Sequence, residues 1–248
     1  MIVLKSPREI ERMRASCRIV AEVLELLKER VAPGVTTLEL EQLAVSETRK
    51  RKALPAFKGY GGFPYALCCS PNDRVIHGMP NAIPLCEGDI LSIDFGVQYD
   101  EFYGDAAVTL PVGGVSAAAQ DLLVATEQSL YRGIEKAVAS GKLFDISHAV
   151  QSCVESRGYS VVRDFVGHGI GKKLHEDPQV PNYGTAGKGV RLKPGMVLAI
   201  EPMVNQGSYA VKVLEDGWTA VTADGKLSAH FEHTVAITDN GPEILTRL

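Results

Sequence analysis

The chain has 248 residues, of which 45% are hydrophobic and 23% charged, and it carries a net charge of −4. A chain of this length can bury a substantial core, this composition excludes long disordered or collagen-like segments, and the weakly acidic balance argues against a general nucleic-acid binder. No apolar run reaches the roughly 18 residues of a membrane span, and the first residues lack the apolar core of a signal peptide, so we expect a cytoplasmic protein without membrane contact.

Two helices are predicted at the start of the chain. Residues 6–9 (SPRE) supply a hydroxyl cap, a proline in the first turn and a glutamate placed for a capping box, and apolar residues then recur at helical spacing. Pro33 and Gly34 end this helix. Residues 36–39 (TTLE) begin a second helix, which we expect to run to about Lys52.

The rest of the chain is predicted to alternate between strands, loops and helices. Residues 54–84 are rich in glycine, proline and aromatic residues, which is typical of loops and short strands, and residues 90–110 predict a β-hairpin. Two further helices are expected at about 116–139 and 145–157, with strands and loops after them. Because no linker or low-complexity segment divides the chain, we expect one domain over residues 1–248.

An internal repeat relates the two halves of the chain. Residues 87–94 (EGDILSID) match residues 194–201 (PGMVLAIE), and both segments end in a carboxylate. A weaker match relates residues 105–110 (DAAVTL) to residues 232–237 (EHTVAI), and in both of these an acid leads into an apolar strand. The two matches together place one acid on each of four predicted strands.

The repeat predicts an α/β (α+β) fold with pseudo-twofold symmetry. Each half, about 6–112 and 113–248, offers two helices followed by two strands that bear one acid each. A helix–helix–hairpin unit duplicated about a pseudo-twofold axis would bring the four acids together.

The acids of the first half can be placed by their spacing. Asp94 and Asp105 would face each other if the hairpin turns about Tyr99 and Asp100, which puts their Cβ atoms roughly 5 Å apart. Two buried carboxylates at this distance repel, and a divalent cation removes the conflict. The alternative is that such acids are solvated or form salt bridges, but no comparable set of lysines or arginines lies beside them in the sequence.

Charge and donor chemistry then suggest the kind of metal site. The charge of the four carboxylates is neutralised by two divalent ions, and at least one carboxylate would bridge them. Nitrogen is expected from His168 in the sequence GHGIG, where flanking glycines let the backbone approach closely. A set rich in oxygen with one imidazole suits Mn, Fe, Co or Zn better than Ca. The same glycines are weak evidence for a phosphate loop, because the context of a dinucleotide fingerprint is missing.

Five motifs in order resemble those of the type I methionine aminopeptidases, and the likeness runs essentially from Ser6 to the C-terminus. The motifs are HGMP (77–80), IDFG (93–96) with an aspartate eleven residues after Asp94, GHGIG (167–171) with HEDP (175–178), IEPM (200–203) and FEHT (231–234). The resemblance implies the pita-bread fold, a pseudo-twofold α/β architecture around a central antiparallel sheet. It also implies a metal-dependent aminopeptidase that hydrolyses the N-terminal methionine from nascent proteins and peptides with a small second residue, by means of a metal-bound hydroxide.

The resemblance also assigns roles to the candidate metal ligands. Asp94 would hold one of the two metal ions, whereas Asp105 and Glu232 would bridge both. His168 and Glu201 would complete the coordination of the second ion. Glu201 would in addition take a proton from the attacking water and pass it to the leaving amine.

Two further histidines would flank the substrate without binding metal. His175 would donate a hydrogen bond to the scissile carbonyl as it becomes an oxyanion, and His77 would contact the nitrogen of the leaving group. His230 shares the face of Glu232 and is not assigned to the site. His233 follows Glu232 on a predicted strand and is expected to point the other way.

The implied specificity pocket is apolar, which suits the flexible, polarizable side chain of methionine. It would be lined by Phe57, Tyr60, Phe63, Cys68, Leu174 and Trp218. Three positions depart from the pattern of the family. Phe57 replaces a smaller residue, Leu174 stands where an aromatic residue is frequent, and Gly96 stands where a threonine is often found.

Some alternatives stay open at this point. A proline-specific peptidase of the same fold and a non-catalytic peptide- or RNA-binding member would share many of these residues. The expected partners are N-terminal Met-peptides of nascent chains, and the protein is expected to be a monomer. The basic run 49–52 is interpreted as a solvated helix end, with transient ribosome contact as the alternative. The five cysteines, without a CxxC pair, indicate reduced thiols.

Overall fold

The computed structural model describes residues 1–248 and contains four α-helices, one large β-sheet and two small ones. The helices are α1 (Pro7–Arg30), α2 (Thr37–Lys50), α3 (Ala117–Ile134) and α4 (Leu143–Glu155). The nine strands of the large sheet are β1 (Leu54–Pro55), β2 (Leu67–Pro71), β4 (Ile90–Tyr99), β5 (Phe102–Pro111), β7 (Gly167–Gly169), β8 (Glu176–Val180), β9 (Val197–Ile200), β14 (Glu232–Thr238) and β15 (Gly241–Ile244). One small sheet contains β6 (Ser160–Val161), β10 (Met203–Asn205) and β13 (Ser228–His230), and the other contains β3 (Arg74–Ile76), β11 (Val211–Val213) and β12 (Ala220–Thr222).

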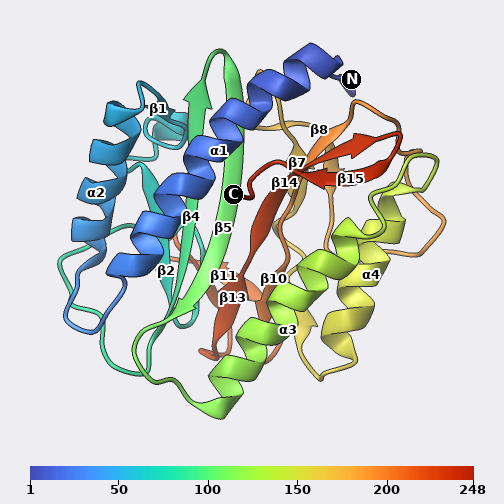
Figure 1. Cartoon of the computed structure of the whole chain (residues 1–248). Helices are drawn as coiled ribbons and strands as arrows, with labels where there is room; N and C mark the ends of the chain where they lie inside the picture. Colours follow the sequence, from blue (N-terminus) through green and yellow to red (C-terminus); the bar gives the residue numbers. More distant parts are fainter.

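The two strands at the centre of the large sheet come from different halves of the chain. The order is β1-β4-β5-β14-β9-β7-β8, with β2 also paired to β4 and β15 to β14, and the pairings are antiparallel. Outward from the contact between β5 and β14, the strands β4 and β2 correspond to β9 and β7. Helices α1 and α2 lie over the side of β4 and β5, and α3 and α4 lie toward the other side (Figure 1). This arrangement confirms the predicted pseudo-twofold α/β fold.

One face of the sheet is buried against the helices. Leu91, Ile93 and Phe95 of β4 pack with α1 and α2 in one apolar cluster. Leu198 and Ile200 of β9 pack with α3 and α4 in a second one. Because successive side chains of a strand point to opposite faces, the intervening residues of these strands face away from the helices. The candidate site is built on that second face.

The predicted starts of the first two helices are confirmed. The Ser6 side chain accepts a hydrogen bond from the backbone of Glu9, whose carboxylate accepts one from the Ser6 backbone, and Thr36 and Glu39 form the same capping box at α2. Each box satisfies backbone N–H groups that the first helical turn leaves without a partner. The two N-terminal helices therefore begin where local sequence alone places them.

The predicted ends of the third and fourth helices are less accurate. Helix α3 ends at Ile134 rather than near residue 139, because Lys136 and Ala137 donate hydrogen bonds to carbonyls three residues back, as in a tight turn. Helix α4 begins at Leu143 because the carboxylate of Asp145 accepts a hydrogen bond from the backbone of residue 142 at 2.8 Å. The difference in α4 is two residues at each end.

The hairpin of β4 and β5 turns one residue later than predicted. Its turn is made by Asp100 and Glu101, which both have positive φ, at 48° and 68°, as a two-residue turn of the primed type requires. Asp94 therefore pairs with Ala107, and Gly96 pairs with Asp105. The prediction that Asp94 and Asp105 lie directly opposite each other is wrong by two residues, although both remain on one face. No glycine marks this turn in the sequence, which is why its position was misjudged.

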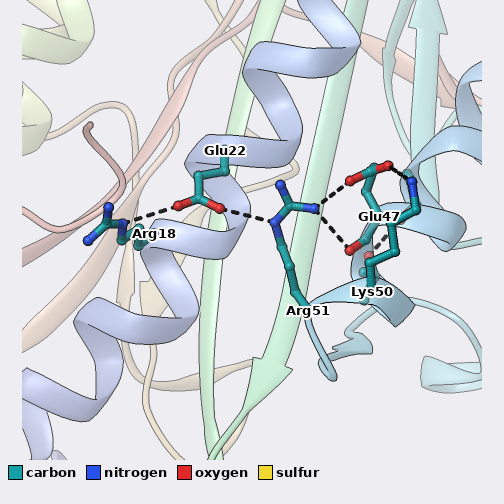
Figure 2. A network of polar contacts seen from close by, with 7 residues as sticks. Arg18, Glu22, Glu47, Lys50 and Arg51 are labelled. Carbon is teal, nitrogen blue, oxygen red and sulfur yellow. Dashed lines mark hydrogen bonds and ion pairs between the residues drawn. The ribbon is translucent and has the colours of Figure 1, made fainter.

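Helices α1 and α2 are joined by a network of ion pairs (Figure 2). Arg51 donates hydrogen bonds to Glu22 of α1 at 3.0 Å and to Glu47 of α2 at 2.5 Å, while Arg18 and Lys50 bind the same two acids. Two residues of the basic run at the end of α2, Lys50 and Arg51, therefore form ion pairs within the fold. None of the four helices combines the length and the apolar character that crossing a membrane requires.

Candidate active site

The pairing of strands places a row of side chains on the face that points away from the helices. Cys68 of β2 pairs with Asp94 of β4. Ala107 of β5 lies between Asp94 and Glu232 of β14, and it pairs with both of them. Asp105 stands two residues before Ala107 and therefore on the same face. Three of the predicted acids thus converge across three neighbouring strands.

The second half of the chain adds His168 and Glu201 to this face. His168 of β7 pairs with Ala199 of β9, and Glu201 follows two residues after Ala199. The Nε2 atom of His168 lies 3.5 Å from Oε1 of Glu201. One ligand atom from each of Asp105, His168 and Glu232 lies within 4.8 Å of the other two. All five predicted metal ligands are therefore brought together where the two halves of the sheet meet.

Three acids of this cluster each bury one oxygen that has no protein donor. Oδ1 of Asp94, Oδ1 of Asp105 and Oε1 of Glu232 have no solvent exposure of note and no hydrogen-bond partner. Burial raises the pKa of Asp94 to about 7 and that of Glu201 to about 8. Burial and the neighbouring carboxylates raise the pKa of Asp105 and of Glu232 well above their ordinary values. A cluster of this kind is strained unless positive charge or protons compensate it.

The tautomer of His168 follows from its hydrogen bond. Its Nδ1 lies 2.9 Å from the carbonyl oxygen of Gly169, and because a carbonyl only accepts, Nδ1 carries the proton. Burial lowers the pKa of His168 to about 3, so the imidazole is neutral. The Nε2 lone pair is therefore left facing the acids. A backbone carbonyl that fixes the ring in this way is the usual support of a metal-binding histidine.

The residues of the cluster fit a divalent cation. They offer unpartnered carboxylate oxygens and one imidazole lone pair, and the only basic side chains within salt-bridge distance are the imidazoles of His168 and His230, both beside Glu201. No lysine or arginine pairs with these acids, so the alternative of a simple salt-bridge network is wrong. Mixed oxygen and nitrogen donors suit transition metals such as Mn, Fe, Co and Zn.

A cavity beside this cluster contains every residue predicted for the site. It is lined by 13 residues, which are the five candidate metal ligands together with His77, His175, Phe57, Tyr60, Phe63, Cys68, Leu174 and Trp218. Phe57, Phe63, Cys68 and Leu174 belong to one buried apolar cluster, with Trp218 packed against it. The rings of Phe63 and Trp218 meet edge to face with centroids 5.2 Å apart. The cavity is thus apolar at one end and carboxylate-rich at the other.

The two histidines predicted to flank the substrate lie at the wall of this cavity. The Nδ1 atom of His175 is 2.7 Å from the hydroxyl of Tyr60, and its ring centroid is 4.3 Å from that of His168. His77 has a positive φ of 57°, which is uncommon for a residue with a side chain and is retained only where the surroundings fix it. The rings of Phe165 and Trp218 pack against His77 at 5.7 and 6.4 Å. Burial lowers the pKa of His77 to about 4.

One histidine of the site was not assigned from the sequence. His230 is buried, its Nε2 has no hydrogen-bond partner, and this atom lies 3.6 Å from Oε2 of Glu201. The two-residue spacing from Glu232 was the signal that could have placed it. His233 points the other way, as expected, because its Nδ1 lies 2.9 Å from the Thr246 hydroxyl and its ring packs on Tyr131.

Sequence comparisons identify relatives over the whole chain. Residues 11–239 match the profile of metallopeptidase family M24. The chain is 58% identical over 246 residues to a methionine aminopeptidase of Clostridium perfringens, with 99% of each chain covered. It is 53% identical over 248 residues to methionine aminopeptidase 1 of Bacillus subtilis, with both chains covered completely.

Solved structures show the same fold. The crystal structure of a methionine aminopeptidase from Thermotoga maritima matches with a TM-score of 0.98 and 49% identity over the whole of both chains. A prolidase from Pyrococcus furiosus matches with a TM-score of 0.80 but only 22% identity, and the match covers 99% of this chain and 66% of that one. The second likeness concerns the fold alone, which is the predicted pita-bread architecture. The family profile and the full-length relatives together show that this chain belongs to metallopeptidase family M24.

Proposed function

We propose that this protein is a methionine aminopeptidase, which hydrolyses the peptide bond after an N-terminal methionine when the second residue is small. The observation that carries the proposal is the shared cavity, in which a buried cluster of acids and a neutral imidazole opens directly onto an aromatic, sulfur-containing pocket. The names of the full-length relatives support it. The much lower identity to the prolidase argues against the alternative of an Xaa-Pro peptidase.

We propose that two divalent ions bind at this cluster, with Mn, Fe, Co or Zn as candidates. Asp94 would hold one ion, His168 and Glu201 would hold the other, and Asp105 and Glu232 would contact both. When bound, such ions supply Lewis-acid chemistry, which polarises a carbonyl and makes water a nucleophile near neutral pH. The free lone pairs described above support this ligand set.

Glu201 is proposed to move the proton. Its carboxylate has one oxygen 3.5 Å from His168 and the other 3.6 Å from His230, so both oxygens face other site residues rather than solvent. As a ligand of a bound ion, Glu201 would be ionised and could therefore accept a proton in the loaded enzyme. Glu201 would accept a proton from the attacking water and return it to the nitrogen of the leaving amine.

His175 and His77 are proposed to bind the reacting peptide bond. The Tyr60 hydroxyl, at 2.7 Å from Nδ1 of His175, can donate to that nitrogen, which leaves the proton on Nε2. Nε2–H would then donate to the scissile carbonyl as negative charge develops on its oxygen. His77, on the wall formed with Trp218 and Phe165, would contact the nitrogen of the leaving group.

The apolar end of the cavity would hold the methionine side chain. Phe63, Leu174 and Cys68 are buried there, and a thioether packs favourably against aromatic edges and other sulfur groups. The substrates would be N-terminal Met-peptides of nascent chains in the cytoplasm. We also propose that the protein acts as a monomer and touches the ribosome only transiently, since part of its basic run is engaged in ion pairs.

Peptide hydrolysis after metal loading tests the proposed function. The purified protein is loaded with Mn²⁺ or Co²⁺ and incubated with Met-Ala-Ser, Met-Pro and Ala-Pro peptides, and released amino acids are measured. Release of methionine from Met-Ala-Ser in preference to cleavage of Ala-Pro is expected. Preferential cleavage of the Xaa-Pro bond would favour a proline-specific peptidase, and metal uptake without any cleavage would favour a binding protein.

A further inference from the structure

Gly96 stands in the middle of β4, where a glycine weakens a strand because it has no side chain to pack. Its backbone does not have a positive φ, so no conformational demand explains it. Gly96 pairs with Asp105 across the hairpin and follows two residues after Asp94, which puts it on the face of the metal cluster. The reason for a glycine at this position must therefore lie in the space around it.

That space is already filled by three side chains. A Cβ atom at residue 96 would lie 3.0 Å from Oδ1 of Asp105, 3.0 Å from Cε1 of Phe57 and 3.1 Å from Cβ of Ala56. All three separations are shorter than an ordinary van der Waals contact. Such a contact is about 3.5 Å or more between carbon atoms. The ring edge of Phe57 and the carboxylate of Asp105 thus both rest against the bare backbone of Gly96.

The ring of Phe57 connects the two ends of the cavity. Phe57 is buried in the apolar cluster of the pocket and lines the same cavity as Asp105. Asp105 contributes an Oδ1 atom that has no protein donor. With Phe57 in place, any side chain at residue 96 would have to displace the ring of Phe57, the carboxylate of Asp105 and the Cβ atom of Ala56.

We propose that Phe57 and Gly96 form a coupled positioning pair. The ring of Phe57 occupies the room in front of Gly96, keeps Oδ1 of Asp105 free and oriented for metal, and limits the depth of the pocket for the N-terminal side chain. The effect on Asp105 concerns metal binding by residues of this chain. The effect on pocket depth rests on the proposed function, because it concerns the substrate.

A double-mutant cycle on metal affinity tests the pair. Mn²⁺ is titrated calorimetrically into the metal-stripped wild type and into Gly96→Ala, Phe57→Ala and the double variant. Gly96→Ala is expected to weaken Mn²⁺ binding by about tenfold or more, since contacting groups couple strongly. The double variant is expected to bind Mn²⁺ more tightly than Gly96→Ala, because removal of the ring gives the new methyl group room.

Phe63 provides the matched control, since it lines the same cavity but is not among the atoms that a Cβ at residue 96 would meet. Phe63→Ala combined with Gly96→Ala should show no rescue. Wild-type affinity in Gly96→Ala, additive effects in the Phe57 pair or equal rescue by Phe63→Ala would each overturn the proposal. Should Gly96→Ala alone not fold by circular dichroism, recovery of folding only with Phe57→Ala counts as the same rescue, and lack of recovery counts against it.

Substrate selectivity tests the pocket depth separately. Phe57→Ala is expected to raise kcat/KM for Phe-Ala-Ser relative to Met-Ala-Ser by about tenfold, because a shortened wall admits a larger side chain. An unchanged ratio would overturn this part of the proposal. If the wild type cleaves neither peptide, the proposed function fails, while the Mn²⁺ titrations still decide whether the pair positions Asp105.

Discussion

At the scale of single residues, the site is governed by groups that lack an ordinary partner. Glu201 has imidazoles beside both of its oxygens, and three neighbouring acids each bury an oxygen without a donor. Buried polar atoms without partners cost free energy, so their accumulation at one place indicates a function that compensates for it. The same reasoning distinguishes His230, which is buried and unpartnered, from His233, which is satisfied by Thr246.

Replacing Glu201 by glutamine should lower kcat for Met-Ala-Ser by about a hundredfold or more, because the amide cannot carry a proton. The amide oxygen still offers a lone pair, so Mn²⁺ binding measured by calorimetry should weaken much less than turnover. Glu29→Gln, on the exposed side of α1, serves as the control and should behave as the wild type. A Glu201→Gln enzyme with wild-type turnover would refute the assigned role.

Removing the hydroxyl of Tyr60 should have a smaller and different effect. In Tyr60→Phe the Nδ1 of His175 loses its partner at 2.7 Å, so the ring is no longer fixed in one tautomer. We expect kcat to fall by about three- to tenfold with little change in KM, as for loss of a group that orients a catalytic residue. His175→Ala should cost more than Tyr60→Phe, and Tyr65→Phe is the matched control. Equal losses in Tyr60→Phe and Tyr65→Phe would show that the hydroxyl of Tyr60 has no special part.

Residue types and the internal repeat predicted the five metal ligands, and the resemblance to the methionine aminopeptidases supplied the other eight of the 13 lining residues of the cavity. His230 was not assigned because its two-residue spacing from Glu232 indicates a shared face but not what the side chain contacts once the chain folds. Its place depends on β13, which pairs with β10 rather than with the large sheet, and no local pattern announces that.

At the scale of elements, the elements that carry the site are held by a few buried contacts. Glu41 of α2 is buried, and its carboxylate accepts hydrogen bonds from the backbone N–H groups of Ala66 and Leu67 at 2.8 to 3.1 Å. This bond fixes the start of β2, which carries Cys68 at the cavity. Capping residues could be predicted because they act within one helical turn. The contact of Glu41 with Ala66 joins residues 25 positions apart, and no local sequence pattern predicts it.

Glu41→Ala should therefore destabilise the protein by at least about 2 kcal/mol, since two buried N–H groups lose their acceptor. Urea unfolding followed by circular dichroism measures the loss, and Glu41→Gln, which keeps one acceptor oxygen, should lose less. For comparison, Arg51→Ala removes a half-exposed ion-pair network and should cost only about 1 kcal/mol, less at high salt. A larger loss for Arg51→Ala than for Glu41→Ala would contradict this ranking.

The hairpin register shows where local sequence reasoning ends. The alternation of apolar residues fixed the face of β4 that meets the helices, and so the face of Asp94 and Asp105 was correct. The turn itself consists of Asp100 and Glu101, neither of them glycine, and Arg12 of α1 binds both residues. A tertiary contact thus selects the turn, and a shift by two residues keeps each side chain on its face.

At the scale of the whole molecule, the metal cluster lies where the two pseudo-symmetric halves meet. The first half contributes Asp94 and Asp105, and the second contributes His168, Glu201 and Glu232 across the contact of β5 with β14. Neither half contains a complete ligand set. Docking of the halves therefore gathers four acids, and a cation that binds only the docked state stabilises the whole fold.

Metal removal should consequently make stability fall as the pH rises. In the metal-free protein the pKa of Asp94 is raised to about 7 and that of Glu201 to about 8, both by burial. Between pH 6.5 and 8.5, roughly, the folded state holds protons that these groups have already lost in the unfolded state, so the free energy of unfolding decreases with pH. The window begins at the ordinary pKa of histidine, so the buried histidines, whose pKa is lowered by burial, oppose this slope near pH 6.5 and contribute little above about pH 7.5.

Thermal melting of EDTA-treated and Mn²⁺-loaded protein across this range measures the effect. We expect Tm of the metal-free form to fall from pH 6.5 to 8.5, while the loaded form changes little, because ligands release their protons when the metal binds. The difference between the two Tm values should thus widen with pH. Asp105→Asn, which removes one of the four charges, should flatten the metal-free curve. A metal-free Tm that is constant or rises over this range would mean that the four acids do not share one buried cluster in solution.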